Sequence, residues 1–172
     1  MYYELIFGGQ FDNSGQKSLK ISDGLEFMYD HTGVSAVKYN GSTYIYRKNA
    51  QNDIIALLDT SGKVVVKYYY DAWGNTITEV LDQAAYTVAN LNPFRYRSYY
   101  YDTETELYYL QSRYYDPEVG RFINGDDGEI TSLSPHHLFA YAGNNPVNET
   151  DSSGKLLQSL LFKLFAGVFC VL

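Results

Sequence analysis

The sequence predicts a mainly β protein, built as an antiparallel sheet of successive hairpins. Two short helices are expected beside this sheet, one near residues 134–142 and an amphipathic one at the C-terminus. The chain has 19 Tyr and 9 Phe in 172 residues, and aromatic side chains favour strands. Its aromatic runs are short and end in acidic turns that contain Gly, which is typical of hairpins. One four-residue turn pattern also recurs along the chain.

The recurring turn has the pattern Asp-x-x-Gly. An Asp side chain accepts backbone hydrogen bonds within a turn, and Gly adopts the positive φ that closes it. Copies begin at Asp12, Asp30, Asp59, Asp71 and Asp151, and Asp102 opens a related turn. We interpret these aspartates as turn residues. A turn that repeats in this way indicates an array of similar units.

Strands are expected between the turns of the first part of the chain, residues 1–91. Their ranges are 35–39, 43–47, 53–58, 63–70 and 75–80. Asn40-Gly41 is a tight hairpin turn between the first two. Residues 83–91 are the least repeat-like piece, and we expect them to loop out.

The second part, residues 92–154, begins with two tyrosine-rich strand candidates, 94–101 and 107–115. A third short strand, 121–123, leads into an acidic loop rich in Gly. Ser134 then suits a helix N-cap and Pro135 the first helical position, which predicts a plug of about two turns.

The stretch YYYDTETELYYLQSRYYDPEVGRFINGD, followed by LFAYAGNNPVN and a final Asp-x-x-Gly, resembles the Rhs repeat-associated core. That core ends the YD-repeat shell of Rhs, wall-associated and Tc-toxin C-type proteins. The resemblance covers 92–154 and extends more loosely over 1–91. It implies a β-shell that encloses a polymorphic C-terminal toxin and delivers it in interbacterial competition. Residues 155–172 then stand at the position of a truncated effector.

The resemblance also implies an intramolecular aspartic protease that frees the enclosed segment. By motif position its residues are Arg113, Asp126 and Asp151, with Asp127 as the alternative to Asp126. Such chemistry needs two carboxylates that share one proton, and an Arg holds one of them ionised.

The sequence departs from this pattern near the expected cut. The family's D-P-x-G-L reads Asp151-Ser-Ser-Gly154-Lys155, and its Gly in the first turn is Glu106. We therefore expect a non-enzymatic core module in which Asp126 and Asp151 are turn or cap residues. Self-cleavage that releases the tail is the alternative. A surface adhesion or glycan-binding module is a further alternative, although tyrosine ladders more often pack a sheet.

Few ligands fit the composition. A net charge of −7 argues against nucleic acid as a partner, because phosphate binding needs clustered Lys and Arg. No cofactor or metal is expected, since a calcium-loop spacing is absent and adjacent His136 and His137 would diverge by about 100° on a helix. The start MYYELIFGGQ lacks a basic and an apolar region, so no signal peptide is expected, although the family is usually secreted or at the cell surface.

The tail at 155–172 is hydrophobic. Lys155, Ser159 and Lys163 recur at helical spacing, which predicts an amphipathic helix that docks on the sheet or touches a membrane surface. About ten strands are too few to curve round a protein-sized cavity. We therefore expect a remnant or terminal piece of a shell. Its open sheet edges should pair with other YD-repeat segments or with a second copy.

Overall fold

The computed structural model describes residues 10–11, 17–20, 24–125, 138–151 and 154–155. The chain forms two compact units. Unit 1 comprises Met1–Tyr69 and Thr76–Ser98, and unit 2 comprises Tyr70–Asn75 and Tyr99–Leu172. The predicted mainly β, antiparallel fold is confirmed in both units.

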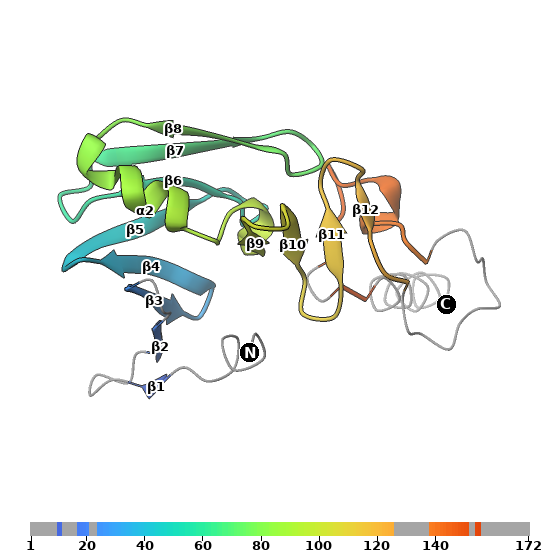
Figure 1. The fold of residues 1–172 in the computed structure, drawn as a ribbon, viewed down its shortest axis with the longest axis horizontal. Helices are drawn as coiled ribbons and strands as arrows, with labels where there is room; N and C mark the ends of the chain where they lie inside the picture. Colours follow the sequence, from blue (N-terminus) through green and yellow to red (C-terminus); the bar gives the residue numbers. More distant parts are fainter. Residues whose placement is uncertain (1–9, 12–16, 21–23, 126–137, 152–153, 156–172) are drawn as a thin grey trace, which may run out of the picture. The chain divides into compact units, whose positions relative to one another are not determined.

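The first sheet has eight strands, and each pairs with the next along the chain in the order β1-β2-β3-β4-β5-β6-β7-β8 (Figure 1). The strands are β1 Gln10–Phe11, β2 Lys17–Lys20, β3 Leu25–Asp30, β4 Gly33–Tyr39, β5 Ser42–Lys48, β6 Ile54–Leu58, β7 Val64–Tyr70 and β8 Thr76–Val80. Side chains alternate between the two faces, so Phe27, Val37, Leu57 and Val66 are fully buried. The result is a simple meander with one buried face.

The turns of this meander have the predicted chemistry. Asn40 and Gly41 both have positive φ, 47° and 81°, as a two-residue hairpin turn of the primed type requires. At the β6–β7 corner, Oδ1 of Asp59 accepts the backbone N–H groups of Ser61 and Lys63 at 2.9 and 3.0 Å. The Asp-x-x-Gly aspartates of the described residues are therefore turn caps.

Residues 83–91 do not loop out, so that prediction was wrong. They form a 3-10 turn, η1 Gln83–Ala85, and a short helix, α2 Tyr86–Leu91, which crosses one face of the sheet (Figure 1). The apolar residues Ala85, Val88 and Ala89 lie at i, i+3 and i+4, and all three are buried. Burial of this stripe outweighs the weak helix propensity of the segment.

A buried polar network holds α2 against the strands. The Tyr46 hydroxyl donates to Oδ1 of Asn92 at 2.6 Å, and Nδ2 of Asn92 donates to the Tyr68 hydroxyl at 3.3 Å. Tyr68 in turn donates to the carbonyl oxygen of Ala89 at 3.2 Å. The buried side chains of this network, Tyr46, Asn92 and Tyr68, thus each have a hydrogen-bond partner, as burial requires.

The second sheet has four short strands in the order β12-β11-β10-β9. They are β9 Tyr100–Asp102, β10 Leu107–Tyr109, β11 Tyr114–Asp116 and β12 Arg121–Phe122. Its core is aromatic: the rings of Tyr115 and Tyr141 are 4.2 Å apart, and Phe122 meets Tyr141 edge-on at 5.9 Å. The tyrosines of the motif therefore pack this sheet.

Both tyrosine-rich strand candidates need correction. Only the end of 94–101 is a strand, because Tyr96–Ser98 is a 3-10 turn, η2, with Arg97 at φ 52°. The candidate at 107–115 is two strands, since Gln111 turns left-handed (φ 64°) and the N–H of Leu110 bonds back to the carbonyl of Arg113 at 2.9 Å. A tight turn thus lies where one strand was expected.

The helix predicted near 134–142 also differs in its described part. Residues 126–137 lie outside the described residues, as does the helix predicted within 156–172. Ala140 forms a β-bridge with Arg121, and the N–H of Phe122 donates to the carbonyl of Phe139 at 2.9 Å. A single 3-10 turn follows, η4 Ala142–Asn144. Pairing with β12 here replaces helical hydrogen bonds.

Within the described ranges, no helix has the length and apolar character needed to cross a bilayer.

Candidate functional site

Arg113 is the centre of the candidate site in unit 2. It lies just before β11, and its side chain is almost fully buried. The guanidinium donates from Nε to the carbonyl of Gly154, from one terminal nitrogen to the carbonyl of Leu138 at 2.8 Å, and from the other to Oδ2 of Asp151 at 3.2 Å. The guanidinium carbon, Cζ, also lies 3.6 Å from the centre of the Phe122 ring. One buried cation therefore joins β11 to three later points of the chain.

Asp151 is buried on the other side of this contact. Its Oδ2 faces Arg113, while its Oδ1 accepts the backbone N–H of Lys155 at 2.9 Å and so closes the final Asp-x-x-Gly turn. The carbonyl of Asp151 accepts the Tyr99 hydroxyl at 2.9 Å. Asp151 thus acts as the predicted turn cap and is also the partner of a buried cation.

Gly154 lies where the surrounding atoms leave no room for a Cβ. Its φ is +67°, and a Cβ there would lie 2.6 Å from the carbonyl oxygen of Leu110 and 2.7 Å from Oγ of Ser112. Its carbonyl accepts the Ser112 hydroxyl at 2.9 Å in addition to Arg113. The peptide bond that leads into Lys155 is therefore held at its carbonyl oxygen by two donors and at its N–H by a carboxylate.

The structure brings together two of the residues that the sequence singled out, Arg113 and Asp151. Asp126 and its alternative Asp127 lie outside the described residues, so a pair of carboxylates at this site stays a prediction. The sequence did not single out Tyr99, Tyr141 or Ser112. Tyr99 and Tyr141 are both buried, with hydroxyls 3.3 Å apart, and Tyr99 contacts Asp151. Among the many tyrosines of the chain, no local pattern marks these two.

A second buried polar cluster lies in unit 1 around Asp53. Its carboxylate accepts the backbone N–H of Arg97 at 2.9 Å and the side-chain amide of Asn49 at 2.6 Å. The hydroxyl of Ser98 donates to the carbonyl of Asn52 at 2.7 Å. These bonds hold Arg97 and Ser98 in their left-handed conformations, so the cluster stabilises a kink.

No three His, Cys, Asp or Glu side chains gather as metal ligands in the described part of the chain.

Comparison with known families shows to which family the chain belongs. The sequence profile of the teneurin YD-shell matches residues 18–147. The chain belongs to the teneurin YD-shell family. The Rhs and YD-repeat resemblance of the motif residues is thereby confirmed.

Two relatives of this YD-shell chain carry toxin-related names. The tRNA3(Ser)-specific nuclease WapA of Bacillus spizizenii is 46% identical over 121 residues, which are 67% of this chain and 5% of that protein. The double-stranded DNA deaminase toxin A of Burkholderia cenocepacia is 34% identical over 96 residues, 56% of this chain and 6% of that protein. The chain thus spans only a small part of these relatives.

A solved structure shares the YD-shell fold. The crystal structure of TcdB2-TccC3 superposes with a TM-score of 0.60 and 23% identity, covering 81% of this chain and 8% of that one. At this identity the similarity concerns the fold alone. It supports the antiparallel β architecture of both sheets.

Proposed function

We propose that this YD-shell chain is a non-enzymatic core module, the terminal piece of a shell that encloses and delivers a C-terminal toxin. The observation that carries the proposal is the set of bonds from Arg113. One buried guanidinium binds the backbone at Leu138 and Gly154 and the carboxylate of Asp151. The module thereby fixes the point at which the chain continues past Lys155.

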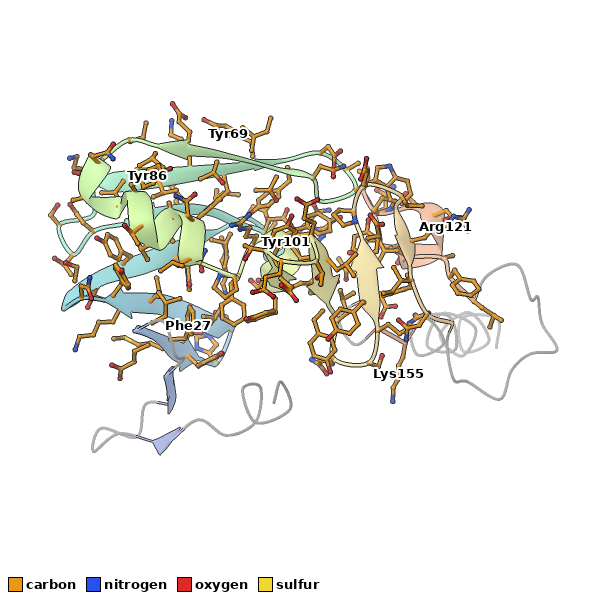
Figure 2. The ribbon with its side chains drawn as sticks, viewed as in Figure 1. Phe27, Tyr69, Tyr86, Tyr101, Arg121 and Lys155 are labelled. Carbon is orange, nitrogen blue, oxygen red and sulfur yellow. The ribbon has the colours of Figure 1, made fainter. Side chains whose placement is uncertain are left out.

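A fixed exit point suits a carrier of attached cargo. Charge-assisted hydrogen bonds in a buried site are strong and oriented, so the Asp151 turn is held rigidly on β11. The side chain of Lys155, by contrast, is exposed and points away from the ribbon (Figure 2). The backbone is therefore held in a defined position within unit 2 as far as Lys155.

The two named relatives support a carrier rather than an enzyme. One is named as a tRNA nuclease and the other as a DNA deaminase toxin, and each shares only 5% or 6% of its length with this chain. A segment that is common to proteins with different named activities does not explain either of those activities. It fits a shared structural part.

We propose that the partners of this module are other YD-repeat segments, which pair with an edge of its sheet. Self-association would be the same edge pairing between two copies of the chain. In the described residues, β8 pairs with β7 and with no further strand. Ile77 on β8 is 70% exposed. An edge strand of this kind can add a strand from another chain.

A chimera tests the proposal. The segment of Bacillus spizizenii WapA that matches this chain is replaced by the corresponding residues of this chain, and proteolysis then reports whether the C-terminal part of WapA is protected. We expect protection equal to that in the parent. The matched control carries Arg113→Ala and should lose it. Protection that survives Arg113→Ala, or no protection in the unmodified chimera, would contradict the proposal.

Self-cleavage remains the second candidate, favoured by one observation. The Gly154–Lys155 peptide bond has its carbonyl oxygen on Arg113 and Ser112 and its N–H on Asp151. Cationic and hydroxyl donors at a carbonyl oxygen are the kind of contact that stabilises an oxyanion. Hydrolysis further requires a second carboxylate, for which Asp126 and Asp127 are the candidates.

A further inference from the structure

The turn between β7 and β8 belongs to unit 2, although its two strands belong mainly to the first sheet. It is an Asp-x-x-Gly turn, in which Oδ1 of Asp71 accepts the N–H groups of Trp73 at 2.8 Å and Asn75 at 3.0 Å. Gly74 closes it with φ 98°. In backbone terms it resembles the β6–β7 turn at Asp59.

Four residues of unit 2 bind this turn, and we call them the turn cradle: Tyr108, Tyr115, Pro117 and Gly120. The hydroxyl of Tyr108 donates to the carbonyl of Gly74 at 2.9 Å, and that of Tyr115 donates to the carbonyl of Trp73 at 2.7 Å. The carbonyl of Pro117 accepts the side-chain amide of Asn75 at 3.2 Å.

The fourth contact is made by the indole of Trp73 on Gly120. A Cβ built at Gly120 would lie 2.8 Å from Cε3 of Trp73, so the indole rests on the bare backbone of this residue. Gly120 also has φ 72°, a conformation that favours Gly. The turn cradle is therefore shaped for a flat aromatic ring at the third turn position.

Only one Asp-x-x-Gly turn of the chain can supply such a ring. The third residues of the five turns are Ser14, Thr32, Ser61, Trp73 and Ser153. In the Asp30 and Asp59 turns this residue bonds to its own aspartate, because the hydroxyls of Thr32 and Ser61 each lie 2.6 Å from Oδ1. Trp73 has no hydroxyl and contacts Gly120 instead. In the same backbone turn, the side chain at the third position thus either bonds within the turn or contacts a distant residue.

We propose that the turn cradle is a recognition site whose partner is a β-hairpin turn of the sequence Asp-x-Trp-Gly-Asn. It selects this hairpin from an array of similar ones, and it binds the same turn when a separate YD-repeat hairpin presents it. All the contacts fall on Trp73, Gly74 and Asn75, so none requires that turn and cradle be one continuous chain. The inference rests on the proposed function in one respect, since both take the chain to be a core module. It adds the segment through which such a module attaches to a repeat array.

Trp73 is the sole tryptophan of the chain, which gives a direct test. The full-length Trp73→Ser protein has no tryptophan, so the emission of an added peptide of residues 64–80 reports on that peptide alone. We expect a blue shift and saturable binding. The same peptide with W73S is the matched control, measured as a competitor, and it should bind at least tenfold more weakly.

Two further variants locate the binding. Tyr115→Phe in the Trp73→Ser protein removes one hydroxyl donor and should weaken the native peptide about fivefold, which is about 1 kcal/mol for one hydrogen bond. Gly120→Ala fills the space of the indole and should make the two peptides bind equally. Trp73→Leu is the second host if Trp73→Ser does not fold, since it keeps apolar volume without fluorescence.

The inference would be overturned if the native peptide and its W73S control bind equally well to the Trp73→Ser protein, or if neither of them binds. Unchanged binding by the Tyr115→Phe protein would also overturn it. The result is independent of the chimera, because the peptide assay involves no shell and no enclosed cargo. If the turn cradle binds the peptide but the chimera does not protect the C-terminal part of WapA, only the proposed function is refuted.

Discussion

Arg113 and Gly154 are 41 positions apart in the sequence, yet Nε of the arginine donates to the carbonyl oxygen of the glycine. This bond closes a long loop inside unit 2. It lies in a buried site, where a charged donor without its acceptors would be costly. The stability of the C-terminal turn and that of the sheet should therefore change together when either residue is altered.

Arg113→Lys should destabilise unit 2 by about 2 kcal/mol, because an ammonium cannot reproduce bonds to Gly154, Leu138 and Asp151 at once. Urea unfolding monitored by aromatic circular dichroism measures the change. Arg121→Lys is the matched control, since Arg121 is exposed (labelled in Figure 2) and should change stability by no more than about 0.5 kcal/mol. Equal effects at both positions would contradict a special role for the buried guanidinium.

Gly154→Ala should cost more than Gly143→Ala. Both glycines have positive φ, which costs about 1–2 kcal/mol for an L residue. A Cβ at Gly143 meets nothing within 4 Å, whereas one at Gly154 meets the carbonyl of Leu110 at 2.6 Å. The difference between the two unfolding free energies isolates the steric term. Similar values for the two variants would mean that the chain near Gly154 relaxes freely.

Glu106→Gly should stabilise the β9–β10 turn by about 0.5–1 kcal/mol, because Glu106 has φ 59° and Gly adopts this region without a Cβ penalty. Glu104→Gly serves as the control in the same turn. Glu104 lacks positive φ, and its change should be neutral or destabilising. Thermal melts of the two variants at one pH decide between them, and a lower melting temperature for Glu106→Gly would count against the argument.

Alkaline pH should weaken unit 1. Burial raises the pKa of Tyr68 from 10.0 to about 12 and that of Tyr46 well above its ordinary value. The folded state therefore holds these protons after the unfolded chain has lost them, so stability is unaffected below pH 10 and falls above it. Tyr68 alone contributes a loss of about 2–3 kcal/mol between pH 10 and 12.

Urea midpoints at pH 9, 10 and 11, together with absorbance of the phenolate, test this dependence. Burial also raises the pKa of Tyr29 to about 12, so Tyr46→Phe removes one of three such groups in unit 1 and should flatten the decline. A stability that stays level up to pH 11 would show that water reaches these hydroxyls.

The aspartates are tested by weighing intact chains. We expect the wild type, Asp126→Asn and Asp151→Asn all to retain the tail beyond Lys155. Asp151→Asn should also be less stable by about 1–3 kcal/mol, because it removes the charge that faces Arg113. A truncation near Lys155 that either substitution abolishes would instead favour the self-cleaving alternative.

Turn chemistry was the most predictable part of the fold. Asp-x-x-Gly and Asn-Gly specify local backbone, and the structure has side-chain caps at Asp30 and Asp59 and a positive φ at Asn40, as expected. Short-range hydrogen bonds decide these turns, so a few neighbouring residues suffice. The meander of strands between them follows for the same reason.

The errors arose where distant contacts decide the backbone. The N–H of Arg97 is bound by Asp53, 44 positions earlier, and this turn replaces the first half of an expected strand. Phe139 and Ala140 bond to β12 where a helix was expected. In the candidate site, the contact between Arg113 and Asp151 was expected from the motif. Tyr99 and Ser112 were not singled out, because they bind the backbone carbonyls of Asp151 and Gly154, which lie far away in the sequence.

The neighbour-to-neighbour order of the first sheet has a consequence for synthesis. Each strand from β2 to β8 pairs with the strand just before it, so its partner has always been made already. At roughly 5–20 residues per second, each new hairpin of the chain emerges from a ribosome within about a second or two. Local pairing of this kind is also fast relative to long-range pairing. The sheet can therefore grow at the pace of translation, and the Asp71 turn is ready before the tyrosines that bind it are made.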